Sequence, residues 1–154
     1  VETAVRITCN NEQAVNAAKC LASTLYALLA GESLQTALRN GLASTENTLA
    51  TWLEEALAIN QLPATEAGEK FGRACHVQQG LPIVFHIARH ATDYQSAIEE
   101  NIRAGGDSCG RAIALGAIMA TAAVNDAESI PLSWLARYAR LTEAADALEH
   151  ATKE

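Results

Sequence analysis

The stretch from Cys109 to about Val124 constrains the fold most, because it is apolar around nearly its whole circumference when drawn as a helix. Its centre, residues 112–120, consists only of alanine, isoleucine, leucine, methionine and glycine. A helix without a polar face is buried on several sides. No apolar run reaches the roughly 18 residues that a membrane span needs. The pattern therefore predicts a central helix of a water-exposed bundle, which neighbours approach closely at Gly116 and Ala120.

The rest of the chain is also typical of helices, since helix formers fill every long segment and alternating β-branched residues are scarce. We predict one all-α domain over residues 1–154, folded as a compact multi-helix bundle. Start and stop signals place its helices at about 12–29, 33–40, 45–59, 83–90, 93–104, 109–124, 132–140 and 143–151. Residues 61–80 are predicted as a long functional loop or crossover. The first seven residues carry no start signal.

Composition narrows the classes of partner and compartment. Eleven Lys and Arg against 18 Asp and Glu give a net charge of −7, which disfavours binding to nucleic acid or anionic lipid through bulk charge. Apolar residues make up 49% of the chain, far too many for disorder. The four cysteines form no C-x-x-C pair, and no signal peptide is visible. We expect a cytoplasmic protein with free thiols and no membrane contact.

The turn before the predicted central helix is the most informative local feature. Gly105 and Gly106 allow a sharp turn, and Asp107 then lies at the positive end of the helix. One interpretation is an ordinary capped helix N-terminus. The other is an oxygen-ligand metal site or an anion pocket. Cys109 is a soft ligand poorly suited to magnesium, so an Asp-x-Asp clamp is absent.

Several segments in a fixed order resemble the C-terminal half of the ADP-ribosylglycohydrolase family, which includes the dinitrogenase-reductase-activating glycohydrolases and the J-type crystallins. They are FGRACHVQQGLP at 71–82, DYQSAIEEN at 93–101, AGGDS at 104–108, IPLSW at 130–134 and ITCN at 7–10. The resemblance implies an all-α fold, hydrolysis of an ADP-ribose glycosidic bond and a pair of magnesium ions. It also implies that this chain is the C-terminal portion of a larger fold.

The family's late metal motif, Gly-Gly-Asp-Thr-Asp-Thr, is only partly present. Asp107 matches its first aspartate and is the metal ligand that the resemblance implies. Ser108 takes the next position, while Cys109 and Gly110 stand where the second aspartate and the ligating threonine would be. The N-terminal Thr-Asp-Asp trio of the family has no counterpart. These departures resemble the crystallin-like branch.

The residues around Asp107 are the predicted substrate-binding set: His76, Gly105, Gly106, Ser108, Cys109 and Arg111. Arg111 lies one helical turn after Asp107. We interpret its guanidinium as neutralising the acidic cluster that metal would otherwise occupy, with an ordinary i,i+4 ion pair as the alternative. Two weaker candidates are zinc at His86 and His90, which lack a third ligand, and a nucleophilic Cys75–His76 pair.

Three functions follow as hypotheses. The first is an ADP-ribosylglycohydrolase acting on ADP-ribose or an ADP-ribosylated protein, provided the chain is complete and holds metal. The second is a catalytically degenerate, crystallin-like structural or ligand-binding protein. The third is an inactive C-terminal fragment. Half of a larger fold exposes an apolar face, so we expect either a homo-oligomer or a separate N-terminal half.

Overall fold

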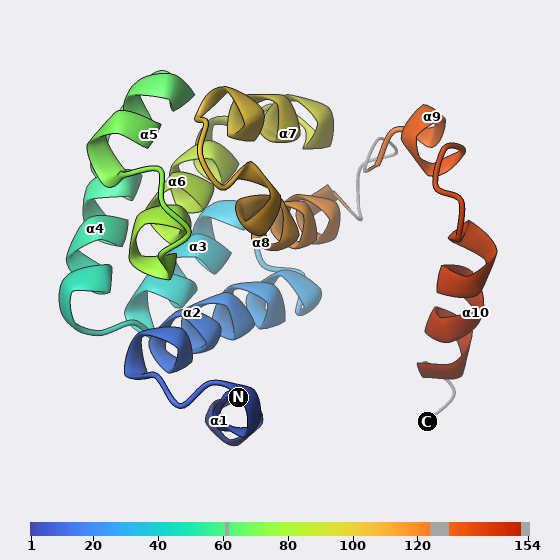
Figure 1. Ribbon diagram of the computed structural model, residues 1–154, viewed down its shortest axis with the longest axis horizontal. Coiled ribbons are helices and arrows are strands. Elements are labelled where there is room, and N and C mark those ends of the chain that lie inside the picture. The colour runs from blue at the N-terminus through green and yellow to red at the C-terminus, as the bar shows by residue number, and fades with distance from the viewer. Residues whose placement is uncertain (61, 124–129, 152–154) are drawn as a thin grey trace.

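The computed structural model describes residues 1–60, 62–123 and 130–151, and within these ranges it contains ten helices and no strand (Figure 1). The all-α prediction is therefore confirmed. The helices are α1 (Glu2–Thr8), α2 (Glu12–Leu29), α3 (Leu34–Ala43), α4 (Asn47–Ala58), α5 (Ala64–Phe71), α6 (Val77–His90), α7 (Tyr94–Arg103), α8 (Ser108–Ala122), α9 (Leu132–Leu135) and α10 (Leu141–Ala151).

Helix α6 is the centre of the core. Every residue from 81 to 88 is buried, and the helix contacts α2, α3, α4, α5, α7 and α8. We call helices α2–α8 the body of the molecule. Phe71, Phe85, Leu38, Leu49 and Leu53 are among the largest side chains buried in it. The core is thus built from side chains of several body helices that pack around α6.

Helix α8 is more open than its sequence predicts. It packs against α2, α6 and α7 and buries Leu115, Ile118 and Met119. However, Ile113 is 79% exposed, and Ala117, one turn further along the same face, is exposed as well. An apolar sequence shows that a face can be buried, but it does not supply a neighbour to bury it. None of the helices in the described ranges is long and apolar enough to cross a membrane.

Short polar side chains cap the starts of α2, α3, α7 and α8. The side chain of Asn11 accepts hydrogen bonds from the backbone at the start of α2, and Ser33 does the same for α3. Asp93 and Ser96 form a reciprocal capping box at the start of α7. Asp107 caps α8. These short polar side chains satisfy backbone N–H groups that have no partner within the helix.

Several boundaries were predicted wrongly. Residues 61–80 are not one long loop, because α5 occupies 64–71. Helix α6 begins at Val77, so Pro82 lies inside the helix rather than at its start. Gly41 does not end α3. A Cβ there would lie 2.1 Å from Thr24 Oγ1, so this glycine lets α3 pack closely against α2.

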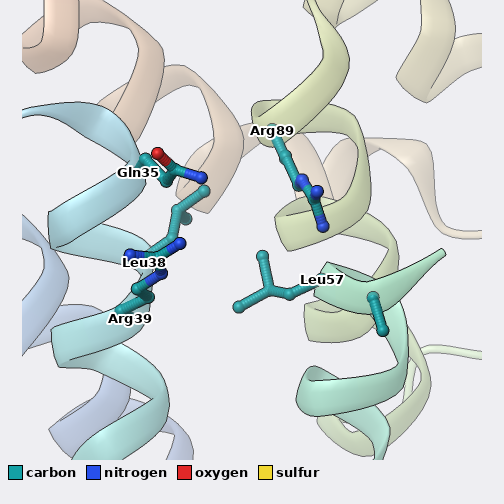
Figure 2. Close-up of a pocket in the computed structure, with 6 residues that line it drawn as sticks. Gln35, Leu38, Arg39, Leu57 and Arg89 are labelled. Atoms are coloured by element: carbon teal, nitrogen blue, oxygen red, sulfur yellow. The ribbon is translucent and has the colours of Figure 1, made fainter. Parts of the chain in front are cut away.

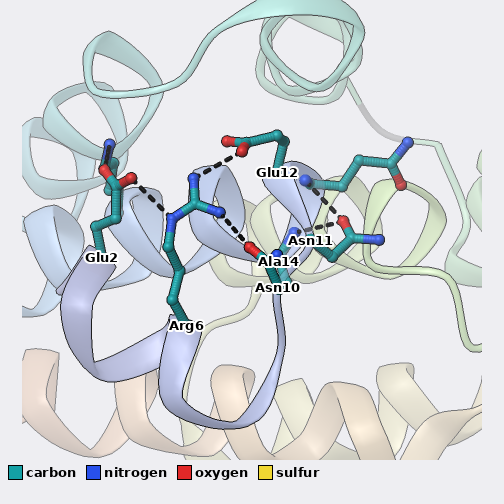
Figure 3. Close-up of polar contacts among 8 residues, drawn as sticks. Glu2, Arg6, Asn10, Asn11, Glu12 and Ala14 are labelled. Atoms are coloured by element: carbon teal, nitrogen blue, oxygen red, sulfur yellow. Dashed lines mark hydrogen bonds and ion pairs between the residues drawn. The ribbon is translucent and has the colours of Figure 1, made fainter.

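Helix α1 has no side-chain cap, and polar contacts hold it against α2 (Figure 3). Arg6 Nε donates to Glu2 at 2.9 Å, Nη1 to Asn10 at 2.8 Å and Nη2 to Glu12 at 2.7 Å. Lys19 of α2 pairs with the second oxygen of Glu2 at 2.8 Å. The segment was not predicted as a helix because it has no capping signal at its start, although Glu2 and Arg6 are spaced as an i,i+4 pair.

The C-terminal arm, residues 130–151, lies apart from the body in Figure 1, where it is drawn in orange and red. None of the residues of α9 or α10 is buried. A contact between the rings of Tyr94 and Trp134, with centroids 6.1 Å apart, joins the arm to α7. The predicted helix at 132–140 is only 132–135, and the predicted end of α8 at Val124 lies outside the described residues.

Candidate functional site

The turn between α7 and α8 depends on both of its glycines. Gly105 and Gly106 have φ values of +72° and +66°, a region that residues with a Cβ rarely adopt. A Cβ on Gly106 would also lie 2.0 Å from the carbonyl oxygen of Arg73. The next residue, Asp107, donates its backbone N–H to that same oxygen at 3.3 Å. The turn therefore packs directly against the backbone of the loop between α5 and α6.

Arg73 links the loop between α5 and α6 to the end of α7. Its Nε donates to the carbonyl of Ala104 at 3.1 Å, and Nη2 contacts the Thr65 carbonyl at 3.2 Å and Glu69 at 3.3 Å. Sequence reasoning missed this residue, since an arginine after a glycine has no distinctive pattern. Arg73 thereby positions residues 74–76, which line one wall of the site.

Asp107 serves as the cap of α8. Its Oδ1 accepts the backbone N–H of Gly110 at 3.0 Å. A Cβ on Gly110 would lie 2.4 Å from the other oxygen, Oδ2, so this glycine makes room for the folded-back carboxylate. The resemblance implies threonine at this position. A threonine there would force the Asp107 carboxylate to move, so the present conformation depends on Gly110.

Arg111 does not form the proposed i,i+4 ion pair, because no carboxylate of the described residues lies within 4.0 Å of it. Its side chain turns instead toward α7, where Nε donates to Asn101 Oδ1 at 2.8 Å and Nη2 to the Asn101 carbonyl at 3.1 Å. Nη2 also donates to the carbonyl of Gly105. Arg111 thus stabilises the glycine turn through hydrogen bonds to Asn101 of α7 and to Gly105 in the turn.

The buried charge of Arg111 is only partly compensated. The residue is 4% exposed, and its Nη1 has no hydrogen-bond partner among the described residues. Burial lowers the pKa of Arg111, while the nearby charge of Asp107 acts in the opposite direction. Asn101, itself 1% exposed, is the second residue that sequence reasoning missed; its Nδ2 donates to the Ser108 carbonyl at 2.8 Å. No direct contact with a carboxylate of the described residues thus supports the neutralising role of Arg111, which stays a prediction.

A cavity of about 200 Å³ opens where α2, α6, the 73–76 loop and the start of α8 meet. We call it the Asp107 pocket. Its polar lining brings together three of the predicted site residues, His76, Asp107 and Arg111, and also includes Cys75 and Gly110. Gly105, Gly106, Ser108 and Cys109 are not among its lining residues, and the thiol of Cys109 is exposed. The remaining wall is apolar, from residues such as Leu81 and Val84.

The donor set does not fit a pair of magnesium ions. Each ion prefers about six oxygen ligands in near-octahedral geometry. Asp107 is the one carboxylate lining the pocket, and one of its oxygens is already engaged in capping. Within the described parts of the chain, no three His, Cys, Asp or Glu side chains are grouped so that they could hold a metal ion. A buried guanidinium in the same lining further disfavours a cation.

The histidine pair on α6 contacts backbone carbonyls. His86 Nε2 lies 2.8 Å from the Leu62 carbonyl and its Nδ1 3.3 Å from that of Ala56, while His90 Nε2 lies 3.1 Å from the Ile59 carbonyl. The two rings are 4.8 Å apart, and burial lowers the pKa of His90. His86 therefore contacts the last turn of α4 and the segment that follows it, which is not the arrangement of a zinc ligand.

Comparison with known proteins agrees with this geometry. Crystallin J1A of Tripedalia cystophora is 29% identical to the chain over 157 aligned positions, which cover 99% of this chain and 47% of that protein. The chain thus spans about half the length of this curated relative. No solved structure matches significantly. The pattern that defines the ADP-ribosylglycohydrolases matches residues 1–154, and the chain therefore belongs to the ADP-ribosylglycohydrolase family.

Proposed function

We propose that this chain is a catalytically degenerate member of its family, in which the Asp107 pocket binds part of an ADP-ribose-type ligand without hydrolysing it. The observation that carries the proposal is the pocket's charged lining. It combines one carboxylate, folded back as a helix cap, with a buried arginine that has an unpartnered Nη1.

The first support is the chemistry of the substituted positions. Metal-assisted glycoside hydrolysis needs oxygen ligands that hold the ions and orient a water. Cys109 and Gly110 supply none, and Gly110 favours the capping conformation of Asp107 over an outward one. Asp107 is the residue that would remain to contact Mg²⁺ through a carboxylate oxygen.

The second support is the fit of a ligand fragment. The cavity of about 200 Å³ is smaller than the roughly 300–1,000 Å³ typical of small-molecule sites, so it suits one moiety such as a ribose or a phosphate. His76 and Asp107 offer hydrogen-bonding groups at its edge, and Leu81 and Val84 offer an apolar surface. Gly105 and Gly106 set the wall without lining it.

A second candidate is a hydrolase whose site is completed by further chain. The relative that matches 99% of this chain is about twice as long, so the remaining half of such a fold has room to provide acidic ligands opposite Asp107. The family's pair of magnesium ions and its activity on ADP-ribosylated proteins belong to this candidate.

We expect an assembly larger than the isolated chain. Ile113 on α8 and Leu132 and Leu141 in the arm are exposed apolar side chains. A second copy of the chain, or the other half of a family-length fold, would bury them. Light scattering of the purified chain separates the two, since a homo-oligomer has a multiple of the 16.3 kDa mass.

Free thiols at all four cysteines suit the reducing conditions of the cytoplasm, where we place the protein.

The proposal is tested by titrating ADP-ribose into the chain with and without Mg²⁺, and by following release of ADP-ribose from an ADP-ribosylated protein. We expect binding heat that does not depend on Mg²⁺ and no release. The His76→Ala variant should bind more weakly, while Arg137→Ala, far along the chain in the arm, serves as a control. Release that requires Mg²⁺ and is lost in Asp107→Asn would instead establish the hydrolase.

A further inference from the structure

A second pocket lies on a different part of the body, between α3, α4 and α6 (Figure 2). It has a volume of about 230 Å³ and is lined by Gln35, Leu38, Arg39, Leu57, Ala58 and Arg89. In Figure 2, α3 presents Gln35 and Arg39 on one side, and Arg89 extends from α6 on the other, above Leu57. It shares no lining residue with the Asp107 pocket.

The charge of this pocket is unusual for an acidic protein. Two arginines and no acidic residue line it, although the whole chain carries a net charge of −7. Six other basic residues are paired with carboxylates, but neither Arg39 nor Arg89 has a carboxylate within 4.0 Å among the described residues. Arg89 donates only a long hydrogen bond of 3.4 Å to Asn60 Oδ1. Both guanidinium groups therefore keep most of their donors for another partner.

The nearby end of α4 does not balance this charge. A helix C-terminus carries about half of a negative elementary charge, against two full positive charges here. Part of that end is also already occupied, because His86 lies within hydrogen-bond distance of the Ala56 carbonyl. An excess positive charge thus remains in a concave, partly apolar site.

We propose that this pocket, which we call the Arg39–Arg89 pocket, binds a phosphate group. Two opposed guanidinium groups match the charge of a phosphate dianion, and arginine forms paired hydrogen bonds with phosphate oxygens. The Gln35 amide adds a neutral donor, and the half-buried Leu57 provides an apolar surface beside it, with the buried Leu38 packed behind. The combination selects a phosphate monoester with an apolar substituent over free inorganic phosphate.

The test is an NMR titration of the arginine Nε–Hε signals of the full chain at constant ionic strength, with inorganic phosphate in one arm and phenyl phosphate in the other. We expect saturable shifts at Arg39 and Arg89, with phenyl phosphate binding about threefold to tenfold more tightly because its ring packs on Leu57. Sodium chloride should give only small, linear shifts. Equal responses to phosphate and chloride would overturn the proposal.

Variants separate a built site from general charge. Arg39→Gln and Arg89→Gln should each weaken phosphate binding by about tenfold or more. Arg137→Gln is the matched control, since it removes the same charge from an exposed arm residue with no ion pair to any described carboxylate, and it should leave binding unchanged. Ala58→Leu fills the pocket without changing charge and should also abolish binding. Binding that survives Ala58→Leu, or that falls equally in Arg137→Gln, would contradict the assigned site.

Discussion

The body and the C-terminal arm are built from similar sequences but differ completely in burial. Helix α2 buries six of its residues, including Val15, Cys20 and Leu28, whereas α10 buries none although it carries Leu141 and other apolar residues at helical spacing. The difference is whether a neighbouring helix covers the apolar side. Amphipathic spacing thus predicts that a helix forms, while burial depends on contacts that the local pattern does not specify.

The comparison is tested most strongly by shortening one leucine in each region. Leu53 on α4 is 0% exposed, and Leu53→Ala should lower the free energy of unfolding by about 2–5 kcal/mol through lost burial and a cavity. Leu132 is 82% exposed, and Leu132→Ala should change it by less than about 0.5 kcal/mol. Urea denaturation of both variants measures the two values. Similar losses would mean that the arm is packed in solution.

The second comparison sets a buried polar contact against an exposed one. Asn101→Ala removes the acceptor of Arg111 Nε and the donor to the Ser108 carbonyl, and should cost about 2–3 kcal/mol, since both groups are left without partners. In the arm, Arg140→Ala removes an exposed pair with Glu143 and should have a much smaller effect, because solvent screens the two charges. Thermal unfolding reports both. A small effect of Asn101→Ala would mean that water replaces its side chain.

A third test concerns how closely the helices of the body approach. Gly41→Ala places a Cβ within 2.1 Å of Thr24 Oγ1 and 3.1 Å of the Cys20 carbonyl, and should destabilise the body by about 1–3 kcal/mol. Gly80→Ala is its control within α6, because the nearest atom there, Arg111 Cγ, is at 3.4 Å. We expect Gly80→Ala to be neutral or stabilising by up to about 1 kcal/mol. If both variants unfold alike, the close contact of α2 with α3 is not rigid.

Thiol labelling perturbs the protein least, because it leaves the fold intact. It reports how exposed each cysteine side chain is. Cys20 is buried, and burial raises the pKa of its thiol to about 11, so at pH 8 it is protonated as well as inaccessible. Cys9, Cys75 and Cys109 are exposed. Mass spectrometry after brief alkylation should find three labels on the native chain and four after denaturation. Rapid labelling of Cys20 would show that the body opens easily.

Much of the fold could be predicted because its causes are local. Asn11, Ser33, Asp93 and Asp107 cap helices through bonds to residues two or three positions away, so their roles are visible in sequence. The close approach at Gly41 was misread as a helix end, since its cause is a side chain of α2. Only the tertiary structure distinguishes a glycine that ends a helix from one that admits a neighbour.

The structure brings three residues of the predicted site together, while the role of that site stays a prediction. His76, Asp107 and Arg111 line one pocket. Sequence reasoning paired Arg111 with Asp107 because they are one turn apart, whereas the guanidinium contacts Asn101 and the Gly105 carbonyl instead. The rotamer of the Arg111 side chain depends on all the groups around it. Spacing along α8 identifies only the neighbours on that helix. The Arg39–Arg89 pocket escaped prediction for the same reason, as its arginines lie on α3 and α6.

The contact of Gly106 with the backbone of Arg73 has a consequence for how the protein can vary. No side chain fits between them, and the Asp107 amide is bonded to the same carbonyl oxygen. An insertion or deletion in the loop after α5 would therefore displace the acidic residue on another helix, even with residues 105–111 unchanged. These two segments, more than 30 positions apart, must be inherited or redesigned together.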